Sequence, residues 1–281
     1  MQAAHLEGLG TMDAIAQEKS ALCRHVSARG LSVFPSDVLR YGPFARLLGR
    51  RVPVVFGDGV FPEKKDGVFD VVRADIAPDG DGHSLSLAGG SIGSHVFAIG
   101  RVSDGMARNA ALAATAALLG GVDSGRVRDA LAIWTPSAGR GEIREISGRI
   151  YYVDCYNASP ASMVDAATCF VRRTPDEKPR LFVLGGMNEL GGQSVALHRE
   201  VGAKLPLRRG DALALFGGNS LAIGEGAAAA GFDSGRITAY DGIDALREAI
   251  ASFDGSVMLK ASRGYALERA LPADFGASAA H

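Results

Sequence analysis

The second half of the chain is constrained most by a strict alternation of strand-like and helix-like segments. Runs rich in β-branched and aromatic residues occur at 149–156, 180–186, 211–217, 236–240 and 257–263. Each run is followed by a segment of helical character, at 161–170, 195–204, near Ala222, at 243–252 and through Leu267. Alternation of this kind is typical of a mostly parallel sheet with helices on both faces. The second half is therefore predicted to be a complete Rossmann-like domain.

The first half of the chain has a different pattern. Four candidate strands lie between Val52 and Ile99 and are separated by Gly- and Asp-rich turns, which predicts a meander or a mixed sheet edge. Other predicted elements are a helix at 12–26, a strand at 31–37, a short helix at 43–49 and helices at 106–119 and 123–133. The stretch PSAGRG at 136–141 has the composition of a loop. We therefore expect two domains, 1–135 and 136–281.

Composition favours small-molecule chemistry. The chain has 281 residues, of which 47% are hydrophobic, and its net charge is −1, so it offers no basic face for nucleic acid. Cys23, Cys155 and Cys169 have neither metal-ligand spacing nor an even count, which indicates reduced thiols. No run has the form of a signal peptide or a membrane span. We expect a soluble, cytoplasmic protein.

A polar cluster follows the first strand of the second half. The segment DCYNASPASM, Asp154 to Met163, comes directly after an apolar run at 149–153. Ser159 and Pro160 are residue types that begin helices, so the cluster lies where a strand ends and a helix starts. In open parallel sheets this carboxyl edge is where ligands bind, because the next helix directs its N–H groups outward there. The cluster is a candidate ligand site.

The same segment resembles the D-[DS]-x-Y-N-A-x-P-x-S-M string that opens the C-terminal domain of the Mur ligases. These are ATP-dependent amide ligases of peptidoglycan synthesis. The likeness is strongest to the MurF type, which adds D-alanyl-D-alanine to UDP-N-acetylmuramoyl-tripeptide through an acyl phosphate. The resemblance implies an α/β chain in which a truncated Mur ligase central domain, 1–135, precedes the C-terminal Rossmann-like domain, 136–281.

In the first half, the resemblance implies a metal site and an adenine contact. The segment AHLEGLGTMDAIAQEKSAL at 4–22 resembles one in which the His binds Mg²⁺ and the Lys is carbamylated, so that it binds the metal as an anion. These residues correspond to His5 and to Lys19, the latter also catalytic. Asn109 corresponds to an asparagine that contacts the adenine of ATP, whereas Gly105 and Met106 depart from that motif. Without the resemblance, the same residues are typical of solvated surface and of a packing helix.

In the second half, the resemblance implies contacts with ATP and with the substrates. Arg140, in the loop AGRGE, corresponds to an arginine that contacts the phosphates, and Asp154 to an acceptor for the ribose hydroxyls. The implied substrate-binding residues are Tyr156, Asn157, Ser162, Met187, Glu189, Lys260, Ser262 and Arg263. Ala261 stands where the motif has Gly. Read alone, Arg140 is a solvated turn residue, and Gly185 with Gly186 forms only a tight turn.

The phosphate-binding loop of the family is absent from the sequence, since neither G-x-x-x-x-G-K-[ST] nor G-T-x-G-K-T occurs. Two hypotheses follow. The chain is the C-terminal portion of a MurF-type ligase, active only with the missing half, which is lost or separately encoded. In that case its ligands are ATP, Mg²⁺, a UDP-linked muramoyl peptide and D-alanyl-D-alanine. Alternatively, it is a stand-alone, non-catalytic protein that binds a ligand or a ligase partner.

Overall fold

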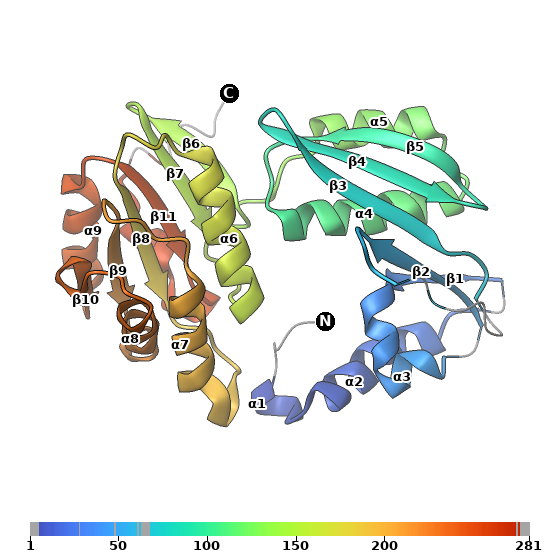
Figure 1. The fold of residues 1–281 in the computed structure, drawn as a ribbon, viewed down its shortest axis with the longest axis horizontal. Coiled ribbons are helices and arrows are strands. Elements are labelled where there is room, and N and C mark those ends of the chain that lie inside the picture. The colour runs from blue at the N-terminus through green and yellow to red at the C-terminus, as the bar shows by residue number, and fades with distance from the viewer. Residues whose placement is uncertain are drawn as a thin grey trace. The chain divides into compact units, whose positions relative to one another are not determined.

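The computed structural model describes residues 6–27, 29–47, 49–60, 62, 68–273 and 275. The chain divides into two compact units. The first is Leu9–Thr135, and the second begins at Pro136 and also includes Leu6, Glu7 and Gly8 (Figure 1). No helix in the described ranges combines the length and the hydropathy that a bilayer span requires.

A five-stranded mixed sheet forms the centre of the first unit. Its strands are β1 (Leu31–Pro35), β2 (Arg50–Phe56), β3 (Val72–Asp79), β4 (Gly82–Gly89) and β5 (Gly93–Ile99), in that order across the sheet. The β1-β2-β3 pairs are parallel and the β3-β4-β5 pairs are antiparallel, so the predicted mixed sheet is confirmed. The helices are α2 (Met12–Arg24), α3 (Gly42–Ala45), α4 (Asp104–Leu119) and α5 (Ser124–Ile133).

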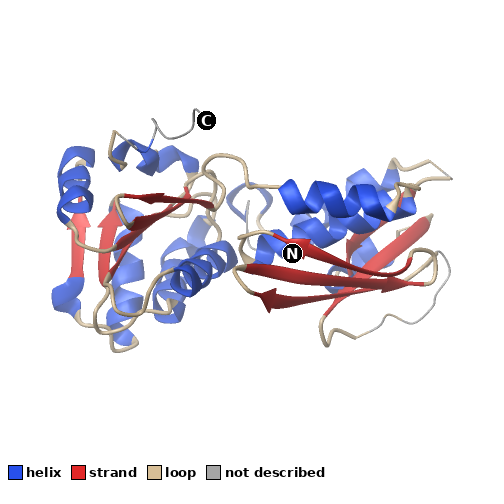
Figure 2. Ribbon diagram, turned by 90° about the horizontal axis from the view of Figure 1, so that it is seen from above, coloured by secondary structure: helices blue, strands red, loops and turns tan. Residues whose placement is uncertain are grey.

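Helix α4 packs on the sheet of the first unit through small residues. Leu85 and Leu87 alternate with half-buried serines along β4 and form one core with Ala107 and Ala111 of α4. The helix begins at Ser103, whose side chain accepts a hydrogen bond from the Met106 N–H at 3.3 Å. Figure 2 shows α4 and α5 against one face of this sheet.

The second unit is an open, doubly wound α/β domain. Its strands are β6 (Glu142–Ile146), β7 (Arg149–Asp154), β8 (Arg180–Gly185), β9 (Ala212–Phe216), β10 (Ile237–Tyr240) and β11 (Ser256–Lys260). The order across the sheet is β10-β9-β8-β11-β7-β6, and all pairs are parallel except β6-β7. Helices α6 (Pro160–Arg173), α7 (Ser194–Lys204) and α8 (Leu221–Ala229) contribute to the core on one face, and α9 (Ile243–Ser252) to the core on the other. The predicted Rossmann-like architecture is confirmed.

The structure of the second unit differs from the sequence-based expectation in two places. The antiparallel edge strand β6 was not predicted, because its sequence EIREI interleaves charges and its residues are only partly buried. The helix expected through Leu267 consists of two short 3₁₀ turns, Arg263–Tyr265 and Leu267–Ala270. Ala266, between them, has a left-handed backbone with φ 48°, which ends the first turn.

Two close contacts away from the carboxyl edge stabilise the second unit, one beside the start of β8 and one between α7 and α8. The Arg180 guanidinium donates two hydrogen bonds, of 2.9 and 2.8 Å, to the two carboxylate oxygens of Asp211, and both side chains are buried. Helices α7 and α8 cross where Gly202 and Gly226 lie. A Cβ atom on Gly202 would stand 1.9 Å from the Ile223 carbonyl oxygen of the other helix.

Candidate functional site

Helix α6 follows β7, and a capping box of hydrogen bonds stabilises its first turn. Ser159 is the N-cap of α6, and its side chain accepts from the Ser162 N–H, while the Ser162 hydroxyl accepts from the Ser159 N–H at 2.9 Å. The Asn157 side-chain oxygen accepts from the Ala158 N–H at 2.9 Å. Ser162 therefore caps the start of α6, and its hydroxyl is engaged there.

A buried lysine organises the centre of the site. Lys260 is the last residue of β11 and lies in register with Asp154, the last residue of the neighbouring β7. Its ammonium donates to Asp154 Oδ2 at 2.7 Å and to the Asn157 carbonyl oxygen at 3.0 Å. Lys260 is 1% exposed and the Asp154 side chain 20%. The lysine thus positions Asp154 and its loop, instead of reaching outward to a substrate as the sequence suggested.

The loop after β8 is tied to the loop after β11. The Asn188 N–H donates to the Ser262 hydroxyl at 2.9 Å, and the Ser262 N–H donates to the Gly186 carbonyl oxygen at 3.0 Å. Glu189 is exposed and has a left-handed backbone with φ 64°. Met187 corrects one expectation, because its side chain is fully buried in the core and offers no surface to a ligand.

His198 stabilises the loop after β8, a role that the sequence did not reveal. Its Nε2 accepts from the Met187 N–H at 2.8 Å, and its Nδ1 lies 2.7 Å from the Ser194 carbonyl oxygen. A nitrogen that accepts from an amide carries no proton, so the ring is neutral with its proton on Nδ1. Burial lowers the pKa of His198, which favours the same neutral form.

Two guanidinium groups flank an exposed tyrosine beside the loop after β7. The Arg140 Cζ lies 3.6 Å from the centre of the Tyr156 ring, and the Arg263 Cζ lies 5.2 Å from it. The Tyr156 N–H donates to the Gly139 carbonyl oxygen at 3.1 Å, which holds the loop of Arg140 against the end of β7. Guanidinium groups bind phosphate and carboxylate oxygens in a bidentate manner, so Arg140 and Arg263, the rim residues beside Tyr156, suit an anionic group.

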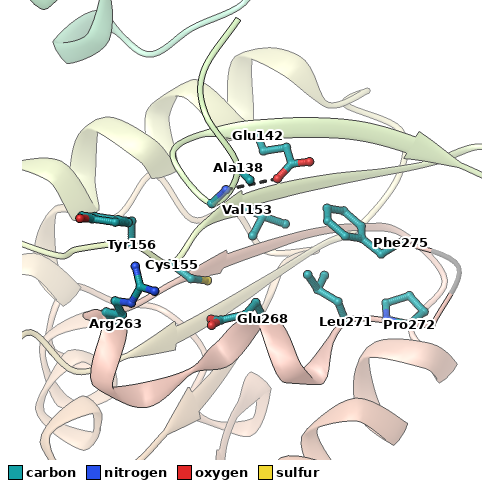
Figure 3. Close-up of a pocket in the computed structure, with 11 residues that line it drawn as sticks. Ala138, Glu142, Val153, Cys155, Tyr156, Arg263, Glu268, Leu271, Pro272 and Phe275 are labelled. Atoms are coloured by element: carbon teal, nitrogen blue, oxygen red, sulfur yellow. Dashed lines mark hydrogen bonds between the residues drawn. The ribbon is translucent and has the colours of Figure 1, made fainter. Parts of the chain in front are cut away.

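A pocket of about 390 Å³ opens beside Tyr156 (Figure 3). It is lined by Ala138, Gly139, Glu142, Val153, Cys155, Tyr156, Arg263, Glu268, Leu271, Pro272 and Phe275. Its volume is in the range of small-molecule sites. The carboxyl edge of the second unit therefore combines the two arginines beside Tyr156, the Asp154–Lys260 ion pair and a cavity.

The structure brings together seven of the ten predicted residues of the second unit, namely Arg140, Asp154, Tyr156, Asn157, Lys260, Ser262 and Arg263. In the first unit, Lys19 is exposed on α2 and Asn109 is exposed on α4. His5 lies outside the described residues. Among the residues that the structure describes, no three His, Cys, Asp or Glu side chains cluster as metal ligands. The Mg²⁺ site at His5 and Lys19 and the adenine contact of Asn109 stay predictions.

Known proteins resemble this chain in sequence. Residues 139–263 match the model of the Mur ligase, glutamate ligase domain. The chain is 26% identical over 212 residues to UDP-N-acetylmuramoyl-tripeptide--D-alanyl-D-alanine ligase of Escherichia coli, which covers 72% of this chain and 43% of that protein. The ligase of the same name from Mycobacterium tuberculosis is 29% identical over 271 residues, 91% of this chain and 50% of that protein.

Solved structures show the same fold. MurF from Acinetobacter baumannii aligns with a TM-score of 0.73 and 23% identity, over 95% of this chain and 56% of that one. MurF from Thermotoga maritima in complex with ADP aligns with a TM-score of 0.71 and 24% identity, over 96% and 58%.

Residues 139–263 of the second unit thus match a domain of the Mur ligase family, and the chain has the fold of the Mur ligase structures. Within that family, the relatives and structures named here are of the MurF type. The chain spans about half the length of the curated relatives it matches.

The cysteine in the pocket is predicted to be unreactive. Burial and, second, the nearby Glu268 carboxylate raise the pKa of Cys155 to about 12, and burial raises the pKa of Cys169 to about 11. At pH 8 about one Cys155 in ten thousand would be a thiolate, the form that alkylating reagents attack. We expect iodoacetamide to label the half-buried Cys23 of the folded protein but neither Cys155 nor Cys169, as read by peptide mass spectrometry. Unfolded protein, the control, should be labelled at all three. Labelling of Cys155 at the rate of Cys23 would show that the pocket activates its thiol.

Proposed function

We propose that this chain is the C-terminal portion of an ATP-dependent amide ligase of the MurF type. Its relatives are named as ligases of UDP-N-acetylmuramoyl-tripeptide and D-alanyl-D-alanine, and we assign the same substrates to the complete enzyme. We further propose that 1–135 is part of the central, ATP-binding domain and 136–281 the C-terminal domain. The observation that carries the proposal is the Asp154–Lys260 pair at the carboxyl edge of a Mur ligase domain, beside the Arg140–Tyr156 stack.

The residues of the second unit fit a nucleotide. ATP, when bound, supplies the phosphoryl group that activates the substrate carboxylate. Arg140 would hold phosphate oxygens and neutralise their charge. Lys260 engages one oxygen of Asp154, so the other is able to accept from a sugar hydroxyl. The second substrate would be oriented by Asn157, Ser262, Tyr156 and Arg263. Such positioning brings its amine close to the activated carboxylate.

The proposed compartment is the cytoplasm. The three cysteines are free, which suits a reducing compartment, and ATP-dependent synthesis needs a supply of nucleotide. The proposed activity requires the P-loop half of the ligase, because cradling the terminal phosphate needs a loop that this sequence lacks.

The alternative, a non-catalytic binding protein, is motivated by departures from the family motif such as Ala261. In the structure this departure is accommodated. Ala261 is fully buried, and a Cβ placed on Gly185 would lie 2.7 Å from the Ala261 Cβ. The alanine fits because its neighbour is glycine, so the loop of Lys260 and Ser262 keeps its hydrogen bonds. The substitution therefore does not favour loss of catalysis.

The test is reconstitution. The chain alone should release no phosphate from ATP in the presence of both substrates, because charge neutralisation at the terminal phosphate is missing. Adding the P-loop half of a MurF relative should give phosphate release that depends on both substrates. Arg140→Ala and Asp154→Asn should each reduce it at least about tenfold, whereas Arg236→Ala, at the opposite edge of the sheet, should not. Phosphate release that is equal in all variants would contradict the assignment, and no release in any mixture would favour the non-catalytic alternative.

A further inference from the structure

A second cavity, of about 490 Å³, opens at the amino edge of the sheet in the second unit. It lies where α7 and α8 end and where the chain enters β9, at the opposite edge of the sheet from the Asp154–Lys260 pair. Helices α7 and α8 lie side by side there (Figure 1). Its volume is in the range of small-molecule sites. Residues that line this amino-edge pocket include Leu205, Leu207, Arg208, Arg209, Ala227 and Phe232.

One side of the amino-edge pocket is apolar. Leu205 and Ala227 are buried members of the core that α7 and α8 form with the sheet. Leu207 and Phe232 are half-buried and pack against the same core. The pocket thus exposes aliphatic and aromatic surface to water, and an apolar ligand would remove that surface from water at a gain in free energy.

Arg209 is the arginine of this lining whose charge is open to a ligand. Arg208 donates to Asp176 Oδ1 at 2.7 Å and is therefore engaged. Arg209 is exposed, and within the described part of the chain its side chain has no hydrogen-bond or ion-pair partner. Asp233, the acid of the lining, accepts from the Gly235 N–H at 2.9 Å and caps a 3₁₀ turn. The pocket therefore combines an apolar side with one available guanidinium.

The charge of a fitting ligand follows from the relative size of the opposing effects. The ends of α7 and α8 disfavour an anion, but each helix end corresponds to only about half an elementary charge. At the end of α8 the Gly231 and Phe232 N–H groups also donate to the Ala228 and Ala227 carbonyl oxygens, each at 3.0 Å. Arg209 has a full charge and two parallel donors that match the two oxygens of a carboxylate. A phosphate, with a charge of about −1.5 to −2, would be only partly compensated by one guanidinium.

We propose that the amino-edge pocket is a second small-molecule site, which binds a monocarboxylate with an apolar body. The carboxylate pairs with Arg209, and the apolar body packs against Leu207 and Phe232. The inference goes beyond the proposed function and does not depend on it, because the pocket lies at the other edge of the sheet. A ligand held between the ends of α7 and α8 stabilises both helices, since it binds the folded unit and not the unfolded chain.

The test is titration of the full chain with 4-phenylbutyrate, followed by isothermal calorimetry and by amide chemical shifts. We expect saturable binding with shifts at Leu205, Arg209 and Phe232 and none at Tyr156. The neutral analogue 4-phenylbutyramide should bind about tenfold or more weakly, because it lacks the charge that pairs with Arg209. Butyrate should also bind about tenfold or more weakly, because it lacks the ring that covers the apolar side.

Variants separate the charged contact from the apolar one. Arg209→Gln should bind the acid about tenfold more weakly and the amide as before, since only the ion pair is removed. Ala203→Trp, at an exposed position of the lining, should fill the pocket and abolish binding of both ligands. The matched controls are Arg128→Gln on α5 and Ala245→Trp on α9, which should bind as the wild type does. All four positions are exposed, so the variants should keep the wild-type thermal midpoint.

Three outcomes overturn the proposal. One is equal affinity of the wild type for the acid and the amide, and another is unchanged affinity for the acid in Arg209→Gln. The third is the absence of saturable binding up to about 10 mM. Shifts confined to Tyr156 and its neighbours would place the acid at the carboxyl edge and reject the amino-edge pocket. The titration uses neither ATP nor the P-loop half, so its failure leaves the ligase proposal unaffected.

Discussion

Replacing Asp211 with alanine should lower the free energy of unfolding of the second unit by about 3–5 kcal/mol. The carboxylate is fully buried and accepts two hydrogen bonds from the Arg180 guanidinium, which is 2% exposed. It also accepts from the Arg208 N–H at 2.9 Å. Its removal leaves a buried guanidinium without a counter-charge, and this uncompensated charge accounts for most of the loss. Hydrogen exchange of peptides from β8 and β9 would measure the effect, since the single tryptophan, Trp134, lies in the first unit.

The matched control for this prediction is Asp176→Ala. Asp176 is 88% exposed and pairs with Arg208 at 2.7 Å, so its loss should cost no more than about 1 kcal/mol. The double change Arg180→Met and Asp211→Leu should recover most of the stability, because it removes both buried charges together. A loss below about 1 kcal/mol in Asp211→Ala would show that another group or water pairs with the Arg180 guanidinium.

Gly202→Ala should destabilise the second unit by about 2–3 kcal/mol, although alanine is the better helix former. Helix propensity alone would favour alanine by about 1 kcal/mol in α7. However, its Cβ would lie 1.9 Å from the Ile223 carbonyl oxygen and 2.9 Å from the Ala227 backbone nitrogen. These are backbone atoms of α8, so no side-chain rotation relieves the overlap, and the two helices have to separate.

Gly192→Ala is the control for the helix crossing. A Cβ on Gly192 meets nothing within 4 Å, so stability should change by no more than about 0.5 kcal/mol. The same exchange measurement on peptides of α7 and α8 reads both variants. Wild-type stability in Gly202→Ala would mean that α7 and α8 move apart at little cost.

The fold of the second unit could be predicted because its strands are continuous apolar runs between helices of ordinary length. All six residues of β8 are buried, and such a run is distinct in the sequence. Strand β6 has no such pattern, since it lies at the sheet edge with partly exposed residues, and its pairing depends on β7. The turns after β11 were mistaken for a helix, because a segment this short is decided by tertiary contacts and not by propensity.

The location of the candidate site could be predicted from the sequence, but the contacts of its individual side chains could not. Asp154 and Lys260 were placed at strand ends by local sequence patterns, yet they are 106 residues apart, and only the register of β7 and β11 pairs them. That pairing buries the lysine, which the sequence suggested as a substrate contact. Met187 was predicted to bind substrate because it belongs to a family motif, but its side chain is buried in the hydrophobic core.

The second unit is not encoded by one continuous stretch of the gene. Leu6, Glu7 and Gly8 belong to it, and the Glu7 N–H donates to the Glu189 carbonyl oxygen at 2.9 Å. The polypeptide therefore crosses from one unit to the other twice, near Gly8 and again at Thr135. A protein expressed from codon 136 onward would lack a piece that packs beside the loop after β8. Domain boundaries chosen from the family match at 139–263 would cut through this unit, and a split at residue 135 would leave part of it on the other fragment.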